Sequence, residues 1–192
     1  CRWPGKTNST NTRSSSSGAT RVMRVGYGAD LLYSQWAQRS AYEWRELFRT
    51  YRQDLFTRTG ALWMARDDDD TTDATIETLT RLHVPFESLD RDALEQRFPQ
   101  FTFGPITRGL FEPEAGVIMA RRAVQMVVRQ AVKQSVDYRV AAVSAPTGEG
   151  AIDGLVISDG SRLTAGTYVF ACGPWLPKLF PEVVSERVRS TR

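Results

Sequence analysis

Histidine and cysteine are nearly absent from this chain, and their scarcity excludes several kinds of chemistry. The 192 residues include 1 histidine and 2 cysteines. One histidine cannot build an imidazole metal centre or a histidine-dependent triad with partners of its own kind. We place His83, which precedes Val84-Pro85, in a loop or cap. Cys1 and Cys172 provide no disulfide framework, so we expect a reducing compartment and a cytoplasmic location.

Long apolar runs and a strong excess of one charge are also missing. No stretch approaches the roughly 18 apolar residues of a membrane span, and the first residues lack the apolar segment of a signal peptide. The net charge of +3 is small and scattered, which argues against a nucleic-acid partner. The remaining composition is that of an ordinary globular protein with one large domain or two small ones.

Apolar residues at steps of three and four predict two long helices. The first covers 31–52, where the residues from Tyr33 to Tyr51 include an aromatic stripe that we expect to pack into the core. The second covers 120–134. Its expected buried positions are Ala120, Val124, Val127, Val128 and Ala131.

Two shorter helices are indicated by acidic residues near their first turns. The acidic run at 67–73 precedes a helical segment at 74–82, and acidic side chains complement the positive end of a helix dipole. We interpret this run as a solvated cap rather than a metal site, because adjacent loop acids lack the geometry that a hard cation requires. A further helix is predicted over 89–98, with Asp90 as its N-cap and Pro99 as its stop.

Four segments are predicted to be extended. A strand over 56–64 should bend at Gly60, where glycine allows an unusual backbone conformation. A second strand is expected over 138–144, followed by a hairpin over 151–165. The apolar run at 167–175 is typical of a parallel strand buried on both faces.

The most informative stretch is a small polar loop followed by two arginines. Residues 14–19 read Ser-Ser-Ser-Ser-Gly-Ala, and such small residues allow the backbone to approach a bulky ligand. Arg21 and Arg24 follow, and a guanidinium binds carboxylate or phosphate through paired hydrogen bonds. In an extended strand these two point to opposite faces, so they need not share one ligand. A serine-rich loop before an edge strand with solvated arginines is the simpler interpretation.

A dinucleotide-binding turn is not found in the chain. Such a turn is rich in glycine and opens a helix, because the pyrophosphate must approach backbone N–H groups. The one candidate, residues 26–31 (Gly-Tyr-Gly-Ala-Asp-Leu), follows a strand and precedes a helix. Its third position is Leu31 instead of Gly or Ala, and no second strand with an acid follows at the proper distance. We therefore interpret this turn as a chance match.

Taken together, the motifs resemble flavin-dependent amine oxidases of the sarcosine, pipecolate and N-methyltryptophan oxidase group. Residues 14–24 resemble the Ser-Ser-His-Gly-x-Thr-Arg-x-x-Arg segment of that family. Residues 111–116 (Phe-Glu-Pro-Glu-Ala-Gly), 138–140 (Tyr-Arg-Val) and 171–175 (Ala-Cys-Gly-Pro-Trp) are similar to later family segments in the same order. The resemblance runs from about Pro4 to Lys178, nearly the whole chain.

The resemblance implies an α/β fold. This would be a doubly wound FAD-binding domain without its N-terminal G-x-G-x-x-G unit, interrupted by part of a mixed-sheet substrate domain. Residues 1–56 and 113–192 would belong to the FAD-binding domain and residues 57–112 to the substrate domain. Because the family's fingerprint precedes the serine-rich loop, the chain would be an internal fragment.

The resemblance also implies roles for individual residues. Arg24 would bind the substrate carboxylate in the catalytic site, and Arg21 would lie in that site beside the flavin. The implied cofactor-binding residues are Ser16, Ser17, Gly18, Thr20, Arg21, Val140, Cys172 and Gly173. Ser17 replaces the histidine usual in the family, and serine does not titrate near neutral pH, so proton handling and flavin attachment there stay open. No metal is implied.

The implied activity is oxidation of the C–N bond of an amino acid or N-methyl amino acid. Hydride would pass to FAD, and O2 would accept the electrons to give H2O2. The implied partner is the small amino-acid substrate, with no nucleic acid and no membrane, and we expect the isolated chain to be inactive. Two alternatives remain: a glycine or D-amino-acid oxidase or dehydrogenase of the same superfamily, and an inactive anion-binding remnant built on Arg21 and Arg24.

Overall fold

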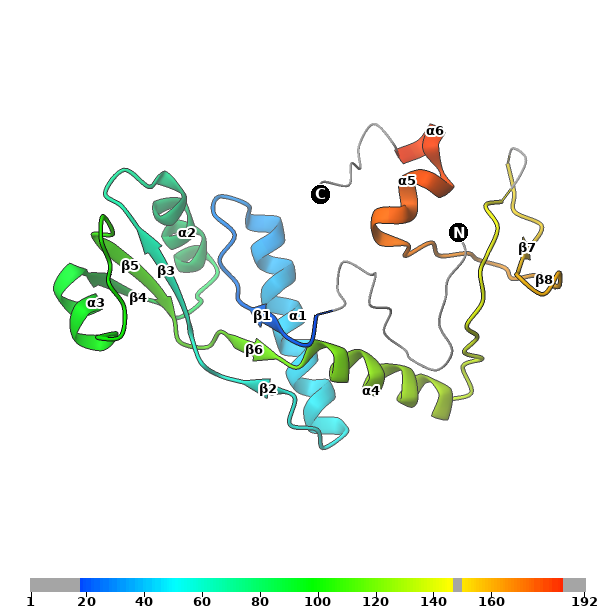
Figure 1. Cartoon of the computed structure of the whole chain (residues 1–192), viewed down its shortest axis with the longest axis horizontal. Coiled ribbons are helices and arrows are strands. Elements are labelled where there is room, and N and C mark those ends of the chain that lie inside the picture. Colours follow the sequence, from blue (N-terminus) through cyan, green and yellow to red (C-terminus); the bar gives the residue numbers. More distant parts are fainter. Residues whose placement is uncertain (1–17, 147–149, 185–192) are drawn as a thin grey trace. The chain divides into compact units, whose positions relative to one another are not determined.

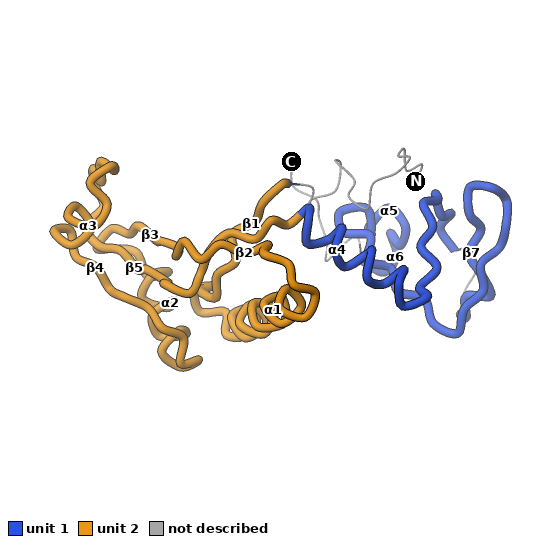
Figure 2. Tube along the Cα trace, turned by 90° about the horizontal axis from the view of Figure 1, so that it is seen from below, with its two compact units in different colours: residues 1–18, 121–192 blue, residues 19–120 orange. Residues whose placement is uncertain are grey.

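The computed structural model describes residues 18–146 and 150–184, which fall into two compact units (Figures 1 and 2). The first unit along the described chain is residues 19–120, coloured orange in Figure 2, and the second, coloured blue, contains Gly18 and the described residues from 121 onward. In the described part of the chain, no helix is both long enough and apolar enough to cross a membrane.

The first unit contains a sheet in which the chain's early and late strands meet. β1 (Arg21–Met23), β6 (Gly116–Ile118) and β2 (Phe56–Thr57) pair in the order β1-β6-β2. Both pairings are antiparallel, with Val22 opposite Val117 in the first of them. The segment that carries the two arginines therefore forms an edge of this sheet, beside a strand distant in sequence (Figure 1).

A second antiparallel sheet lies further along the same unit. It consists of β3 (Ala61–Ala65), β5 (Arg108–Glu112) and β4 (Glu87–Asp90), in the order β3-β5-β4. Gly60, at φ 72°, separates β2 from β3, which confirms the predicted bend. The predicted single strand over 56–64 is wrong, because this bend sends its two halves into different sheets.

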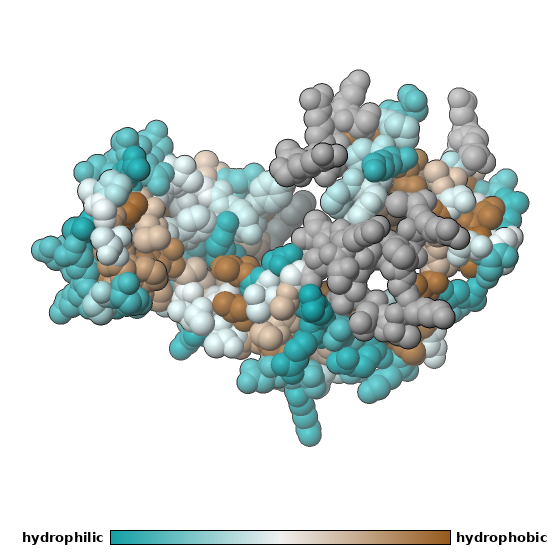
Figure 3. Space-filling view, in the orientation of Figure 1, coloured by the Kyte–Doolittle hydropathy of each residue, from teal (hydrophilic) through white to brown (hydrophobic). Residues whose placement is uncertain are grey.

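Buried apolar side chains hold the second sheet to the helix beside it. α2 (Asp70–Arg81) places Leu79 in a cluster with Val84 and with Leu110 of β5. Leu79 and Leu110 are fully buried, so each removes its whole side chain from water. α3 (Arg91–Arg97) and β4 lie at the left of Figure 1, and in the same orientation Figure 3 shows hydrophilic residues there around a smaller hydrophobic patch.

Acidic caps begin the two shorter helices of this unit, as predicted. The Asp69 carboxylate accepts hydrogen bonds from the backbone N–H groups of Thr71 and Thr72, and the hydrogen bond from the Thr72 hydroxyl lowers the pKa of Asp69. The Asp90 carboxylate caps α3 by accepting the N–H of Ala93 at 2.8 Å. Asp70 and Asp73 of the acidic run thus lie within α2, which begins earlier than the predicted 74–82.

The long helix α1 (Leu31–Thr50) confirms the first predicted helix but not its buried face. Ser34, Ala41 and Phe48, seven positions apart, are buried. Tyr33 is 56% exposed and packs instead against neighbouring surface aromatic rings, so the expectation that the stripe from Tyr33 packs into the core is wrong at this position. The buried face of α1 therefore consists of two small residues and one phenylalanine, and the face with the most aromatic residues is not the buried one.

In the second unit, α4 (Ala120–Lys133) confirms the second predicted helix and corrects its orientation. Its buried residues are Ala123 and Met126. Val124 and Val127, expected to be buried, are 37% and 39% exposed. The apolar residues of α4 gather on one side of the helix, but only the edge of that side, at Ala123 and Met126, is buried, because burial depends on which element packs against the helix.

The end of the chain departs most from the sequence-based expectations. A short hairpin, β7 (Leu155–Val156) with β8 (Arg162–Leu163), confirms the one predicted there. The strand expected over 138–144 is reduced to a single bridge between Val143 and Ile157. The predicted strand was too long, because among the described residues the segment pairs with another strand segment at this bridge alone.

The strand predicted over 167–175 is not formed. Residues Gly173–Trp175 form a 3-10 turn, which continues into α5 (Leu176–Leu179) and α6 (Pro181–Val184). Val169 is 86% exposed. A parallel strand needs hydrogen-bonding neighbours, and every pairing between the strands described here is antiparallel.

Candidate active site around Arg24

Arg24 directly follows β1, and two aromatic rings hold its guanidinium group. The guanidinium carbon lies 4.3 Å from the ring centroid of Tyr27 and 4.1 Å from that of Trp63. Both contacts are cation–π interactions, which attract the guanidinium to the ring faces. Nη1 also donates a hydrogen bond to the Gly26 carbonyl. These three contacts restrict Arg24 to one orientation.

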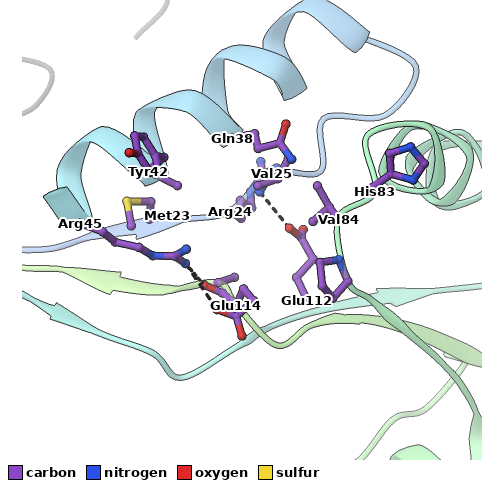
Figure 4. Close-up of a pocket in the computed structure, with 13 residues that line it drawn as sticks. Met23, Arg24, Val25, Gln38, Tyr42, Arg45, His83, Val84, Glu112 and Glu114 are labelled. Atoms are coloured by element: carbon purple, nitrogen blue, oxygen red, sulfur yellow. Dashed lines mark hydrogen bonds and ion pairs between the residues drawn. The ribbon is translucent and has the colours of Figure 1, made fainter.

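A buried carboxylate accepts hydrogen bonds from two of the residues that contact Arg24. Glu112, at the end of β5, is 2% exposed. It accepts hydrogen bonds from the backbone N–H of Val25 at 2.8 Å, from that of Gly26 at 3.3 Å, and from the indole N–H of Trp63 at 3.0 Å. Figure 4 shows Glu112 directed at the backbone beside Arg24. Glu112 thus connects β5 with β3 and with the turn after β1, and its burial is compensated by these donors.

The glycine-containing turn at 26–31 is held by protein groups. Besides the hydrogen bonds to Glu112, the Gly28 N–H donates to the Thr75 hydroxyl at 3.2 Å, and the Thr78 hydroxyl donates to the Gly28 carbonyl at 2.8 Å. A phosphate loop instead directs its N–H groups at the ligand. The structure therefore supports the interpretation of this turn as a chance match to the dinucleotide fingerprint.

Arg24 lines two cavities of the first unit. The helix-side cavity, about 190 Å³, lies between α1 and the 83–85 turn and is bounded by Ala41, Val84 and Glu112 among others (Figure 4). His83 lies in this turn after α2, with φ 54°, as a loop position requires and as the sequence predicted.

The strand-side cavity is wider and more open. It has a volume of about 310 Å³, and its walls are β1, β3, β6 and the bend before β3. Its lining residues are Val22, Arg24, Thr59, Gly60, Ala61, Leu62, Trp63, Gly116 and Val117. Arg24 is the one charged residue in this lining, and no carboxylate among the described residues forms an ion pair with it. An apolar space with one guanidinium suits a small ligand that carries a carboxylate.

The other predicted site residues lie in different parts of the chain. Within residues 19–120 the structure brings together Thr20, Arg21 and Arg24. Thr20 and Arg21 are exposed at the edge of the first sheet, where Nη1 of Arg21 donates to the Thr20 carbonyl at 2.9 Å. Arg21 lines neither cavity. Ser16 and Ser17 fall outside the described residues.

The remaining predicted cofactor residues belong to the second unit. They are Gly18, Val140, Cys172 and Gly173. Val140 is 46% exposed, Cys172 is a half-buried free thiol, and Gly173 opens the 3-10 turn with φ 52°. Their assignment to the cofactor stays a prediction.

Sequence reasoning missed the residues that hold Arg24 in place. Neither Trp63 nor Glu112 was singled out, although Glu112 offered a signal. It is an acid directly after the apolar Leu110 and Phe111 of a strand, a position at which burial is common and charge is not. Only the pairing of β3 with β5 shows that Trp63 is near it.

Comparison with known proteins identifies the class of protein to which this fold and site belong. Residues 10–192 match the model of the family described as FAD dependent oxidoreductase. The chain belongs to this family, whose members use FAD to oxidise amines and amino acids. The suspected relation to sarcosine and N-methyltryptophan oxidases is confirmed.

Two curated relatives specify the resemblance. Monomeric sarcosine oxidase of Streptomyces avermitilis is 25% identical over 174 residues, a match that covers 90% of this chain and 45% of that protein. N-methyl-L-tryptophan oxidase of Yersinia pestis is 23% identical, with 90% and 46% covered. The chain therefore spans about half the length of the curated relatives it matches.

Solved structures show the same fold. NikD, an unusual amino acid oxidase essential for nikkomycin biosynthesis, superposes with a TM-score of 0.69 at 24% identity over 91% of this chain and 46% of that one. L-proline dehydrogenase from P. horikoshii gives 0.73 at 19% identity, with 82% and 42% covered. These likenesses confirm the predicted fold class, a partial α/β fold of the FAD-dependent amino acid oxidases.

The edge of β1 and the turn at 26–31 differ in how accessible their backbone groups are to a ligand. β1 is an edge strand with Val22 62% exposed, so backbone groups and the hydroxyl of Thr20 are accessible to a planar ligand. In the turn at 26–31, in contrast, the N–H groups of Gly26 and Gly28 donate to Glu112 and Thr75. In the described part of the chain, no group of histidine, cysteine and acidic residues is arranged to hold a metal ion.

Proposed function

We propose that the protein carrying this chain oxidises the C–N bond of an amino acid or N-methyl amino acid, with hydride transfer to FAD and O2 as the final acceptor. The observation that supports this most is the guanidinium of Arg24 at the wall of the strand-side cavity. It is fixed by Tyr27 and Trp63 and has no carboxylate partner of its own among the described residues. A guanidinium held in one orientation can bind the carboxylate of a substrate through paired hydrogen bonds.

Each residue would have a separate task in this reaction. Arg24 would hold the substrate carboxylate by two parallel hydrogen bonds, while Val22 and Leu62 would contact the apolar part of the substrate. Thr20 and Arg21, at the edge of β1, would contact the flavin. FAD itself would supply the hydride acceptor. The positions 16–18, Val140, Cys172 and Gly173 would complete the cofactor site.

Sheet membership supports the domain division of the whole enzyme. The first sheet uses residues before 58 and after 115, and the second sheet lies entirely within 61–112. This separation agrees with an FAD-binding domain formed by 1–56 and 113–192 and a substrate domain that contains 57–112. The proposed partner is a small amino-acid substrate. The proposed cytoplasmic location is supported by the small number of cysteines.

Lysine substitutions of the two arginines test this proposal in the FAD-bound protein. Arg24→Lys should raise KM for the amino-acid substrate roughly tenfold or more while FAD stays bound, because lysine cannot reproduce the planar fork. Arg21→Lys should alter the flavin absorbance spectrum more than it alters substrate affinity. The measurements are steady-state kinetics, peroxide formation and flavin absorbance of both variants. Unchanged kcat and KM in Arg24→Lys would refute the assignment.

A further inference from the structure

We infer that Glu112 is a positioning residue that sets the guanidinium of Arg24 for the substrate carboxylate. The inference rests on the proposed function, since it concerns the same site. Glu112 does not line the strand-side cavity and would not touch the substrate there. It acts through the groups that hold Arg24.

Two of the three contacts of Arg24 pass through residues bound to Glu112. The carbonyl of Gly26 accepts the hydrogen bond from Arg24, and the N–H of Gly26 donates to the Glu112 carboxylate at 3.3 Å. The ring of Trp63 covers the guanidinium at 4.1 Å, and its indole N–H donates to Oε1 of Glu112 at 3.0 Å. Tyr27 provides the third contact independently.

Glutamate is needed at position 112 because both of its carboxyl oxygens accept hydrogen bonds. Oε2 accepts the N–H of Val25 at 2.8 Å, and Oε1 accepts the indole of Trp63. Glutamine has nearly the same shape but only one acceptor oxygen, and its NH2 group would face a donor on one side. A buried N–H without an acceptor is costly, so the turn or the indole must move.

Close packing at Gly26 leaves little freedom for this arrangement to shift. A Cβ at Gly26 would lie 2.9 Å from Oε1 of Glu112 and 2.6 Å from Cγ2 of Thr75. The carboxylate therefore rests directly on the backbone of the turn. A change at position 112 is transmitted to the guanidinium without an intervening mobile group.

The test is Glu112→Gln in the FAD-bound protein, with propionate as a probe that carries only the carboxylate. We expect the Kd of propionate, followed by the flavin difference spectrum, to rise roughly tenfold, as for the loss of one charge-assisted hydrogen bond. KM for the amino-acid substrate should rise more than kcat falls. Propionamide, which has no charge, should bind both proteins equally, and the spectrum of bound FAD should not change.

Glu114→Gln is the matched control. Glu114 follows two residues later and pairs with Arg58 at 2.8 Å and with Arg45, at exposed positions. Its substitution should leave the Kd of propionate unchanged. An equal loss in Glu112→Gln and Glu114→Gln would overturn the positioning role, and so would an unchanged Kd in Glu112→Gln.

A double variant separates this inference from the proposed function. If Glu112 acts through Arg24, Glu112→Gln should add little to the loss caused by Arg24→Lys. Additive losses would overturn the inference while leaving the proposed role of Arg24 intact. Arg24→Lys with an unchanged Kd would instead refute the proposed function. If Glu112→Gln fails to fold, Trp63→Phe removes the indole donor but keeps a ring over Arg24, and an unchanged Kd in that variant would overturn the inference.

Discussion

The indole N–H of Trp63 donates a hydrogen bond of 3.0 Å to Oε1 of Glu112, while the face of the same ring covers the guanidinium of Arg24. Trp63 thereby connects a buried acid with an arginine at a cavity wall. Trp63 lies in β3 and Glu112 in β5, and only the pairing of these neighbouring strands brings the two residues together. Hydrogen bonding and ring stacking thus act on different atoms of one side chain.

Gly26→Ala should destabilise the protein by roughly 1–3 kcal/mol, because the added methyl group would overlap a well-packed site. The new Cβ would lie 2.6 Å from Cγ2 of Thr75 and 2.9 Å from Oε1 of Glu112. Urea unfolding measures the change. Gly166→Ala is the control, since no atom lies within 4 Å of a Cβ there. Equal stability of the two variants would contradict the packing argument.

Leu110→Ala should cost about 2–5 kcal/mol of unfolding free energy, the usual range for a leucine removed from a core. Leu110 is fully buried in one cluster with Leu79 and Val84, so little rearrangement can fill the space. Val169→Ala, at a side chain 86% exposed, should change stability by less than about 0.5 kcal/mol. The comparison needs only urea unfolding curves, and a loss of the same size in both variants would argue against this core.

The isolated 192-residue chain should bind FAD weakly or not at all. In the one glycine-containing turn that resembles a dinucleotide loop, the N–H groups of Gly26 and Gly28 donate to Glu112 and Thr75, so neither glycine presents its N–H to a pyrophosphate. Isothermal titration of FAD into the chain tests this expectation. Submicromolar affinity would show that another segment of this chain binds the pyrophosphate.

The Asp73–Arg108 pair should make stability depend on pH in the acid range. Hydrogen bonds of 2.5 and 3.0 Å from Arg108 lower the pKa of Asp73 below its usual 3.8. Because the folded pKa is the lower one, the pair stabilises the fold above pH 3.8, and this contribution is lost as the pH falls through the folded pKa. Asp73→Asn should therefore be less stable than the parent at neutral pH.

The difference between Asp73→Asn and the parent should be largest at neutral pH and should narrow at an acid pH below the lowered pKa of Asp73, where the parent's carboxyl also becomes neutral. Urea unfolding of both proteins at the two pH values measures it. Asp67→Asn is a suitable comparison, since Asp67 accepts a hydrogen bond from the Thr107 hydroxyl and forms no ion pair among the described residues. A difference independent of pH would mean that the charge of Asp73 contributes nothing.

Local signals predicted the helices well, because a helix is stabilised by residues close in sequence. Asp90 was recognised as the cap of α3, and the acids before α2 as its cap. The expected buried faces were less accurate, since burial depends on which side another element covers. Tyr33 on α1 and Val124 on α4 are exposed for this reason.

The sequence alone determined the two long helices, the acidic helix caps, the family and the candidate arginine, since all of these depend on neighbouring residues or on motif order. The tertiary structure decided which strands pair: it placed β6 between β1 and β2 and left 167–175 without a strand. It also decided how Arg24 is held, because Trp63 and Glu112 reach it through contacts between residues far apart in the chain. Such contacts form only when strands pair and side chains pack, so they cannot be predicted from the spacing of residues along one sequence.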